Sequence, residues 1–290
     1  MTTSAELRSG KGSGDENFPV ASVLVAPKHR PAVLAFYEFV RVADDIADHA
    51  QLAPAEKLTR LDRMEASLLG TSEAEPEGVR LCGVLRERGL SSVHAQHLLR
   101  AFRHDVTKLR YENWDDLIEY CRYSAMPVGR YVLDVHGEAQ STWPANDALC
   151  AALQIINHLQ DCAKDFRELD RVYVPLDALA ANGLTVEALA APEASPALRR
   201  CIRDLAARIG ILLEQSRPFA AQIRDRRLAM EVAAIQSLAE RLVGVLRTRD
   251  PLSERVHLSK PQMLLTGLGA AAGVLSRRLL SRAPSSAFAR

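Results

Sequence analysis

The apolar residues of this chain recur at three- and four-residue spacing over most of its length, which is the pattern of amphipathic helices. Ala, Leu, Arg and Glu dominate, and alternating runs of β-branched residues are scarce. With 290 residues, 48% of them hydrophobic, the chain can bury a large core. The pattern therefore predicts an all-α fold.

Prolines and capping residues set the expected helix boundaries. Pro31 and the Ser195-Pro196 pair suit first turns, and Asn113 suits an N-cap because Asp116 stands three positions later. Predicted helices run over about 31–49, 54–69, 92–109, 196–223, 227–246 and 260–280, and three more begin at 114, 127 and 143. The last of these is expected to continue through Asp165. Residues 71–78, 170–175 and 180–195 are predicted to be linkers or loops, the second because Pro175 cannot continue a helix.

The predicted loops are too short and scattered to separate two domains, and no segment repeats at a fixed period. We therefore expect one domain over residues 17–282. Residues 1–16 are polar, rich in Gly and Ser, and lack the apolar stretch of a signal peptide, so we expect a flexible tail there and another over 283–290.

Charge and cysteine content narrow the function classes. The chain has 37 basic and 36 acidic residues and only 5% aromatic residues, which argues against a nucleic-acid partner. The five cysteines include no Cys-x-x-Cys pair, and an odd number suits the reducing cytoplasm.

Residues 263–280 are apolar but contain three glycines and then Arg277 and Arg278, so we do not expect them to span a membrane. They indicate a core helix with a basic end, or a contact with a membrane surface.

One predicted helix carries acidic residues inside an apolar stretch. Asp44 and Asp48 are four residues apart, so both carboxylates project from one face, and Arg41 lies on that face one turn earlier. Like charges at this spacing destabilise a bare helix, and a divalent cation would reverse that penalty. Asp45 points away from this face.

A second helix repeats the arrangement. Gln154, Asn157, Asp161 and Asp165 are spaced three, four and four, so they form a polar stripe on an otherwise apolar helix. A single Asp-x-x-x-Asp pair is usually a solvated face, but two such pairs inside apolar helices are far rarer by chance. Oxygen ligands on two facing helices suit Mg²⁺, which joins a few carboxylates to substrate phosphates. The pattern indicates a diphosphate site that holds Mg²⁺ through Asp44, Asp48, Asn157, Asp161 and Asp165.

At these residues the sequence resembles the squalene/phytoene synthase family, from about residue 17 to 260. Both acidic motifs match it, and so does an Arg-x-Tyr-x-Pro loop. The loop is matched by Arg171, Tyr173 and Pro175. A middle motif, Tyr-Cys-x-x-x-Ala-x-x-Val-Gly, is matched by Tyr120, Cys121, Ala125, Val128 and Gly129. The resemblance implies an isoprenoid-synthase-type helical fold around a central cavity. For the chemistry in that cavity, our candidates for stabilising a cation or relaying a proton are Tyr120 and Tyr37. It also implies that the substrate is bound by Arg41, Asn17, Gln154, Asn157, Arg171, Tyr173 and Arg255.

Finer features resemble one branch of that family, which converts presqualene diphosphate and water to hydroxysqualene and diphosphate in hopanoid biosynthesis. They lie in residues 16–22, 124–129 and 165–175. That branch needs no nicotinamide, and no Gly-x-Gly-x-x-Gly turn follows a strand in this chain. Many members carry a tyrosine late in the chain, where this sequence has Gln236, which leaves room for a site that handles water.

Three other functional hypotheses stay open. A head-to-head condensing synthase of the same family would consume farnesyl diphosphate. A non-catalytic relative acting as a scaffold would be expected to lose its aspartates, yet Asp44, Asp48, Asp161 and Asp165 are all present. A helical lipid-binding module would not need these carboxylates. For the favoured reading we expect a cytoplasmic enzyme, with contact to the membrane or to neighbouring pathway enzymes as further possibilities.

Overall fold

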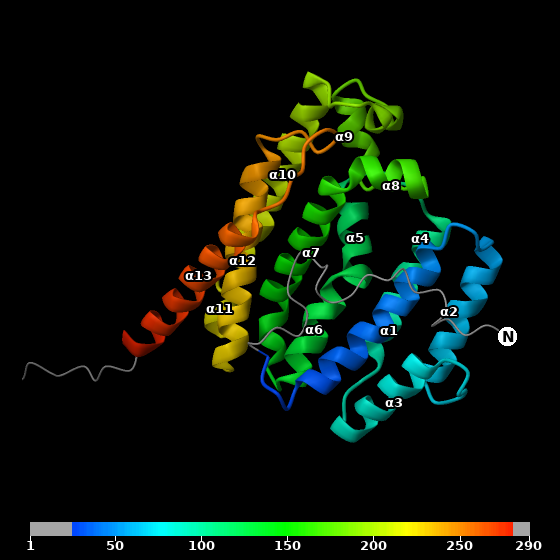
Figure 1. Ribbon diagram of the computed structural model, residues 1–290, viewed down its shortest axis with the longest axis vertical. Coiled ribbons are helices and arrows are strands. Elements are labelled where there is room, and N and C mark those ends of the chain that lie inside the picture. The colour runs from blue at the N-terminus through cyan, green and yellow to red at the C-terminus, as the bar shows by residue number, and fades with distance from the viewer. Residues whose placement is uncertain (1–24, 281–290) are drawn as a thin grey trace, which may run out of the picture.

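The computed structural model describes residues 25–280, and this part of the chain is built from helices without any β-strand (Figure 1). An isolated bridge joins Arg110 to Val172. The predicted all-α fold is therefore confirmed. The α-helices are α1 (Arg30–Asp48), α2 (Pro54–Leu68), α3 (Pro76–Arg88), α4 (Val93–Thr107), α5 (Trp114–Ser124), α6 (Met126–Val135), α7 (Trp143–Gln160), α8 (Cys162–Leu169), α9 (Leu176–Ala181), α10 (Pro196–Ser216), α11 (Phe219–Gln222), α12 (Arg226–Leu246) and α13 (Lys260–Leu280), and the 3₁₀ helices are η2 (Gln140–Thr142) and η3 (Val186–Ala190).

The expected caps are present. The Asn113 side chain accepts a hydrogen bond from the Asp116 amide at 3.0 Å, and Ser195 Oγ accepts one from the Leu198 amide at 3.2 Å. Each satisfies a backbone donor that the first turn of its helix leaves without a partner.

Four boundary predictions were wrong. The expected linker over 71–78 gives way to α3 at Pro76, because the first turn of a helix tolerates proline. The expected loop over 180–195 contains the end of α9 and all of η3. The helix expected to reach residue 223 ends at Ser216, since Pro218 provides no amide donor.

The fourth error concerns the second acidic helix, which breaks at Asp161. Asp161 has φ −101° and ψ 8°, so α7 ends before it and α8 begins after it. The amides of Asp161 and Asp165 still donate to the carbonyls four residues earlier, at 3.0 and 2.8 Å. The chain therefore bends here without losing those two bonds.

The apolar core has two parts that meet at α6. One is formed mainly by α1 to α4, and the other mainly by α5, α7, α10 and α12. Tyr131 of α6 stacks on Phe36 of α1, with ring centroids 3.9 Å apart and planes 9° from parallel. Its hydroxyl donates to the Ala32 carbonyl at 3.0 Å. This buried contact holds α1 against α6.

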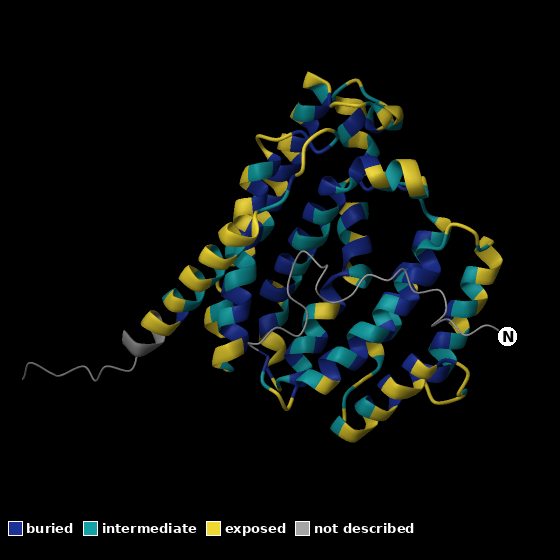
Figure 2. Cartoon of the chain, in the orientation of Figure 1, coloured by how far each residue is buried: buried dark blue, intermediate teal, exposed yellow. Residues whose placement is uncertain are grey.

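Helix α13 lies along α12 and extends beyond the rest of the fold (Figure 1). Much of its surface is exposed, as the yellow ribbon in Figure 2 shows. Within residues 25–280, no helix combines the length and apolar character that a membrane span requires.

Helices α6 and α7 approach closely at Gly129. A Cβ atom there would lie 1.9 Å from Asn146 Oδ1 and 2.7 Å from Cys150 Sγ. Asn146 cannot easily move aside, because it is 1% exposed and its amide donates to the Met126 carbonyl at 3.3 Å. Only glycine allows this contact.

We expect Gly129→Ala to lower the free energy of unfolding by about 1–3 kcal/mol, because the added methyl overpacks the α6–α7 contact. Urea unfolding followed by circular dichroism measures this loss. Gly83→Ala is the matched control, since Gly83 lies inside α3 and a Cβ atom added there would meet no other atom within 4 Å. That change should raise stability by up to about 1 kcal/mol. Equal effects of the two substitutions would contradict the packing argument.

Candidate active site

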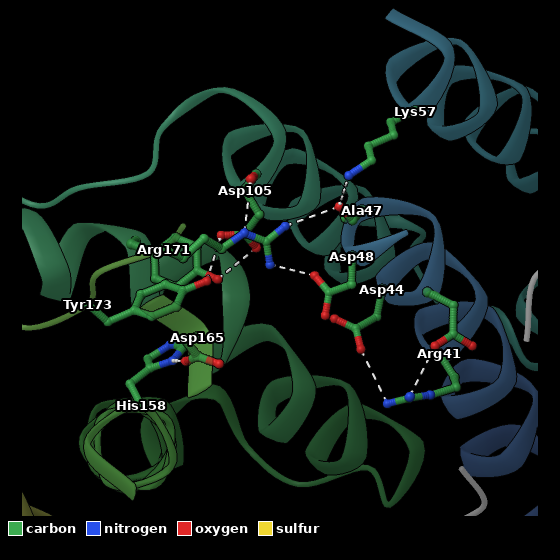
Figure 3. Close-up of polar contacts among 12 residues, drawn as sticks. Arg41, Asp44, Ala47, Asp48, Lys57, Asp105, His158, Asp165, Arg171 and Tyr173 are labelled. Carbon is green, nitrogen blue, oxygen red and sulfur yellow. Dashed lines mark hydrogen bonds and ion pairs between the residues drawn. The ribbon is translucent and has the colours of Figure 1, made fainter. Parts of the chain in front are cut away.

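Asp44 and Asp48 lie on one face of α1 and point into the space shown in Figure 3. The opposite, apolar face of α1 is buried, which fixes the orientation of the helix. The side chains of Asp44 and Asp48 are 36% and 39% exposed. Arg41 Nη1 lies 3.3 Å from Asp44, and Nη2 lies 3.0 Å from Asp45, which is buried. Desolvation and then repulsion from Asp48 raise the pKa of Asp44 well above its usual range. The Asp44–Asp48 pair thus suits a cationic ligand.

Arg171 connects α1 to the loop that follows α8. Its guanidinium pairs with Asp48, donates to the Ala47 carbonyl at 3.1 Å, and donates to the Asp105 carbonyl at 3.2 Å (Figure 3). Lys57 of α2 donates to the same Ala47 carbonyl at 2.8 Å. Although burial alone would lower the pKa of Arg171, Asp48 raises it, so the guanidinium is a permanent charge.

Asp105 of α4 is a buried acid that the sequence analysis missed. Its carboxylate accepts hydrogen bonds from Tyr120 OH at 2.8 Å and from Tyr173 OH at 3.1 Å. Burial raises the pKa of Asp105 to about 6, while Arg171 and the Tyr120 hydrogen bond act to lower it. A signal was available, because Asp105 continues the apolar stripe of Leu98 and Phe102.

Asp165 of the second acidic stripe lies across from the Asp44–Asp48 pair. Asp165 of α8 and His158 of α7 are on the far side of the space into which Asp44 and Asp48 point (Figure 3). The ring of His158 stacks on Tyr173, with centroids 3.5 Å apart, and its Nδ1 lies 3.8 Å from Asp165. Burial, then repulsion from Asp165, raises the pKa of Asp161. His158 is therefore part of the polar site.

The amide residues of the predicted stripe precede these aspartates along α7. Gln154 Nε2 lies 3.0 Å from His158 Nε2, so Gln154 helps to orient the histidine. Asn157 lies one turn before Asp161, and its carbonyl accepts the Asp161 amide.

The donor set fits a hard divalent cation that also takes ligands from its substrate. Over residues 25–280, no three side chains among His, Cys, Asp and Glu come together as a complete protein metal site. The carboxylates instead occur as the pairs Asp44/Asp48 and Asp161/Asp165. Mg²⁺ prefers oxygen ligands, keeps several waters, and usually combines one or two carboxylates with phosphate oxygens. The arrangement is compatible with that mode of binding.

An apolar cavity of about 270 Å³ lies on the N-terminal side of the acidic residues of α1 and of the α7–α8 segment. Tyr37 and Val40 of α1 and Leu153 of α7 line it. Asn146 and Glu231 are polar exceptions in an otherwise mainly apolar wall. The remaining wall residues include Val33, Phe36, Val128, Val132, Leu149, Leu228, Val232 and Ile235. The polar site therefore adjoins a cavity suited to a hydrocarbon chain.

Three further predictions have different outcomes. Asn17 lies outside the described residues. Arg255 is exposed in the loop between α12 and α13. The next residue, Val256, lies against the end of α7, because the Gln160 side chain donates to its carbonyl. Gln236 is turned toward α10, where Ser216 Oγ lies 2.6 Å from its Oε1, so it does not line the cavity.

Comparison with known proteins gives consistent matches. The family model described as squalene/phytoene synthase matches residues 12–262. The chain is 57% identical to the hydroxysqualene synthase of Rhodopseudomonas palustris, covering 99% of this chain and 98% of that protein. It is 52% identical to the hydroxysqualene synthase of Zymomonas mobilis, covering 93% and 92%.

A solved structure agrees. The squalene synthase HpnC of Alicyclobacillus acidocaldarius superposes with a TM-score of 0.72 at 30% identity, covering 84% of this chain and 91% of that one. The resemblance found in four motifs is therefore confirmed along most of the chain, and the chain belongs to the squalene/phytoene synthase family.

Proposed function

We propose that this protein is a hydroxysqualene synthase, which converts presqualene diphosphate and water to hydroxysqualene and diphosphate. The observation that carries the proposal is the placement of two carboxylate pairs and Arg171 beside an apolar cavity. This combination suits a substrate with a diphosphate head and a prenyl body. The relatives that are 52–57% identical over nearly the whole chain carry the same name.

The polar residues would bind the diphosphate. Mg²⁺ would be held by Asp44, Asp48, Asn157, Asp161 and Asp165, and when bound it would neutralise charge on the departing diphosphate. The guanidinium groups of Arg41, Arg171 and Arg255 can each donate two hydrogen bonds to phosphate oxygens. Those of Arg41 and Arg171 already face the Asp44–Asp48 pair.

The apolar wall would protect the carbocation left when the C–O bond breaks. Phe36, Tyr37 and Val40 of α1 and Leu153 of α7 exclude water from most of the prenyl body. The ring of Tyr37 can stabilise positive charge as the cyclopropane rearranges. Water is then captured at a single carbon instead of along the chain.

Water capture also needs a proton acceptor, and Asp105 is suited to that role through a tyrosine. As the water oxygen bonds to the cation, its proton passes to the Tyr120 oxygen, and Tyr120 passes its own proton to Asp105. The 2.8 Å hydrogen bond between Tyr120 and Asp105 is already aligned for the second transfer. Burial raises the pKa of Tyr120, so the phenol is protonated at the start.

We place this activity in the cytoplasm. All five cysteines are unpaired, and four of them are buried, as is usual for proteins of a reducing compartment.

Purified protein with Mg²⁺ and presqualene diphosphate, without any nicotinamide, should yield a hydroxylated C30 alcohol, identified by mass spectrometry. In H₂¹⁸O the alcohol should carry the heavy oxygen, because water is its source. Chelation of the metal should stop the reaction. Consumption of farnesyl diphosphate with presqualene diphosphate left untouched would instead establish a condensing synthase.

Asp44→Asn should slow diphosphate release by about a hundredfold or more, since it removes one charge from the cation site. A phosphate-coupled assay measures the rate, and circular dichroism should show an unchanged helical signal. Asp204→Asn, on the exposed surface of α10, is the matched control and should retain full activity. A near-normal rate in the Asp44 variant would refute the metal assignment.

Asp105→Asn should separate ionisation from water capture. Asparagine keeps one acceptor oxygen for one of the two tyrosine hydroxyls, its amide NH2 can donate to the other, and the backbone carbonyl that binds Arg171 is unchanged. Diphosphate release should therefore continue, whereas water capture slows by about a hundredfold and hydrocarbon products accumulate.

The pH profile checks the same role. Because the acceptor must be ionised, the wild-type ratio of alcohol to hydrocarbon products should fall as the pH drops through the Asp105 pKa of about 6. In the variant this ratio should not change over that pH range. Tyr120→Phe should resemble Asp105→Asn, while Tyr173→Phe should not. An unchanged product ratio and pH profile in Asp105→Asn would rule out the relay.

A further inference from the structure

Helix α13 has an apolar face that nothing in the described part of the chain covers. Leu264, Leu265, Leu268 and Leu275 are 44–70% exposed. Their spacings of three, four and seven residues place them within one stripe of the helix. Isolated exposed leucines are ordinary on protein surfaces, but four on one helical face form a continuous patch.

The opposite face of the same helix packs on the protein. Val274 is 4% exposed, and a Cβ atom on Gly267 would lie 3.7 Å from the Ala234 side chain of α12. Helix α13 is therefore held in place from one side while its leucine face points outward. Figure 2 shows the exposed surface along this helix, which extends away from the fold.

The charged side chains from Lys260 onward are all basic. From Lys260 to the end of the chain the sequence has no Asp or Glu. It contains the basic residues Lys260, Arg277, Arg278, Arg282 and Arg290. A helix that combines an apolar face with basic residues is suited to the interface of an anionic bilayer, where leucines enter the acyl region and cations meet the headgroups.

We propose that the leucine face of α13 docks the protein on anionic phospholipid, with the helix lying in the plane of the bilayer surface. A second copy of the chain is a poorer occupant, because pairing two such segments would bring basic residues against basic residues. The proposed reaction adds a reason, since a C30 substrate and a C30 alcohol partition into lipid. The docking itself follows from the leucines and the charge and does not depend on that reaction.

The test is co-sedimentation of the full chain with vesicles of equal parts phosphatidylglycerol and phosphatidylcholine, without substrate. Wild-type protein should sediment with these vesicles, and much less with phosphatidylcholine alone or at high salt. The triple variant Leu264→Ser/Leu265→Ser/Leu268→Ser should lower the partition coefficient by about tenfold or more, because three apolar side chains leave the acyl region. These residues are exposed, so the fold should be retained.

The matched control is Leu69→Ser/Val79→Ser/Ile211→Ser, which changes three exposed apolar side chains outside α13. It should bind like the wild type. Protein that stays in the supernatant, or equal binding by the two triple variants, would overturn the proposal. So would a dimer in light scattering that the α13 variant dissociates, since a second copy would then cover the face. Turnover measured in detergent should be equal for all three proteins, so loss of docking is distinguishable from failure of the proposed activity.

Discussion

The buried guanidinium of Arg171 is the contact on which the polar site depends. It joins three elements by binding Asp48, the Ala47 carbonyl at the end of α1, and the Asp105 carbonyl near the end of α4. The guanidinium itself is buried, so removing Asp48 would leave its charge without its ion-pair partner. The position of α1 relative to the loop after α8 is thereby fixed, and with it the separation of the two carboxylate pairs.

The site combines two environments that are rarely adjacent. On one side, partly exposed carboxylates repel one another and favour cations. On the other, the cavity wall offers almost no polar atoms to a bound chain. Breaking a C–O bond at this boundary places the anion among polar groups and the cation among apolar ones. Residues of both core clusters line the apolar side, for example Phe36 of one and Leu149 of the other.

Much of this arrangement could be predicted from the sequence. Asp44 and Asp48 share a helical face because their spacing requires it, and the caps at Asn113 and Ser195 follow from side-chain chemistry. The break at Asp161 was not predicted, because no Pro or Gly stands near it, so the sequence carries no strong signal that a helix ends there. Asp105 was missed because its partners Tyr120 and Tyr173 are distant in sequence, and only the fold brings them together.

The close contact at Gly129 limits how the cavity can change during evolution. Gly129 lines the cavity, yet no larger residue fits there without displacing Asn146. The separation of the α6 and α7 backbones is therefore fixed at this point of the wall. Other lining residues, such as Leu149 and Leu153 of α7 and Val232 of α12, carry side chains whose size can change. Adaptation to longer or shorter hydrocarbon chains would thus proceed through such side chains, while the spacing of the two helices at Gly129 is kept.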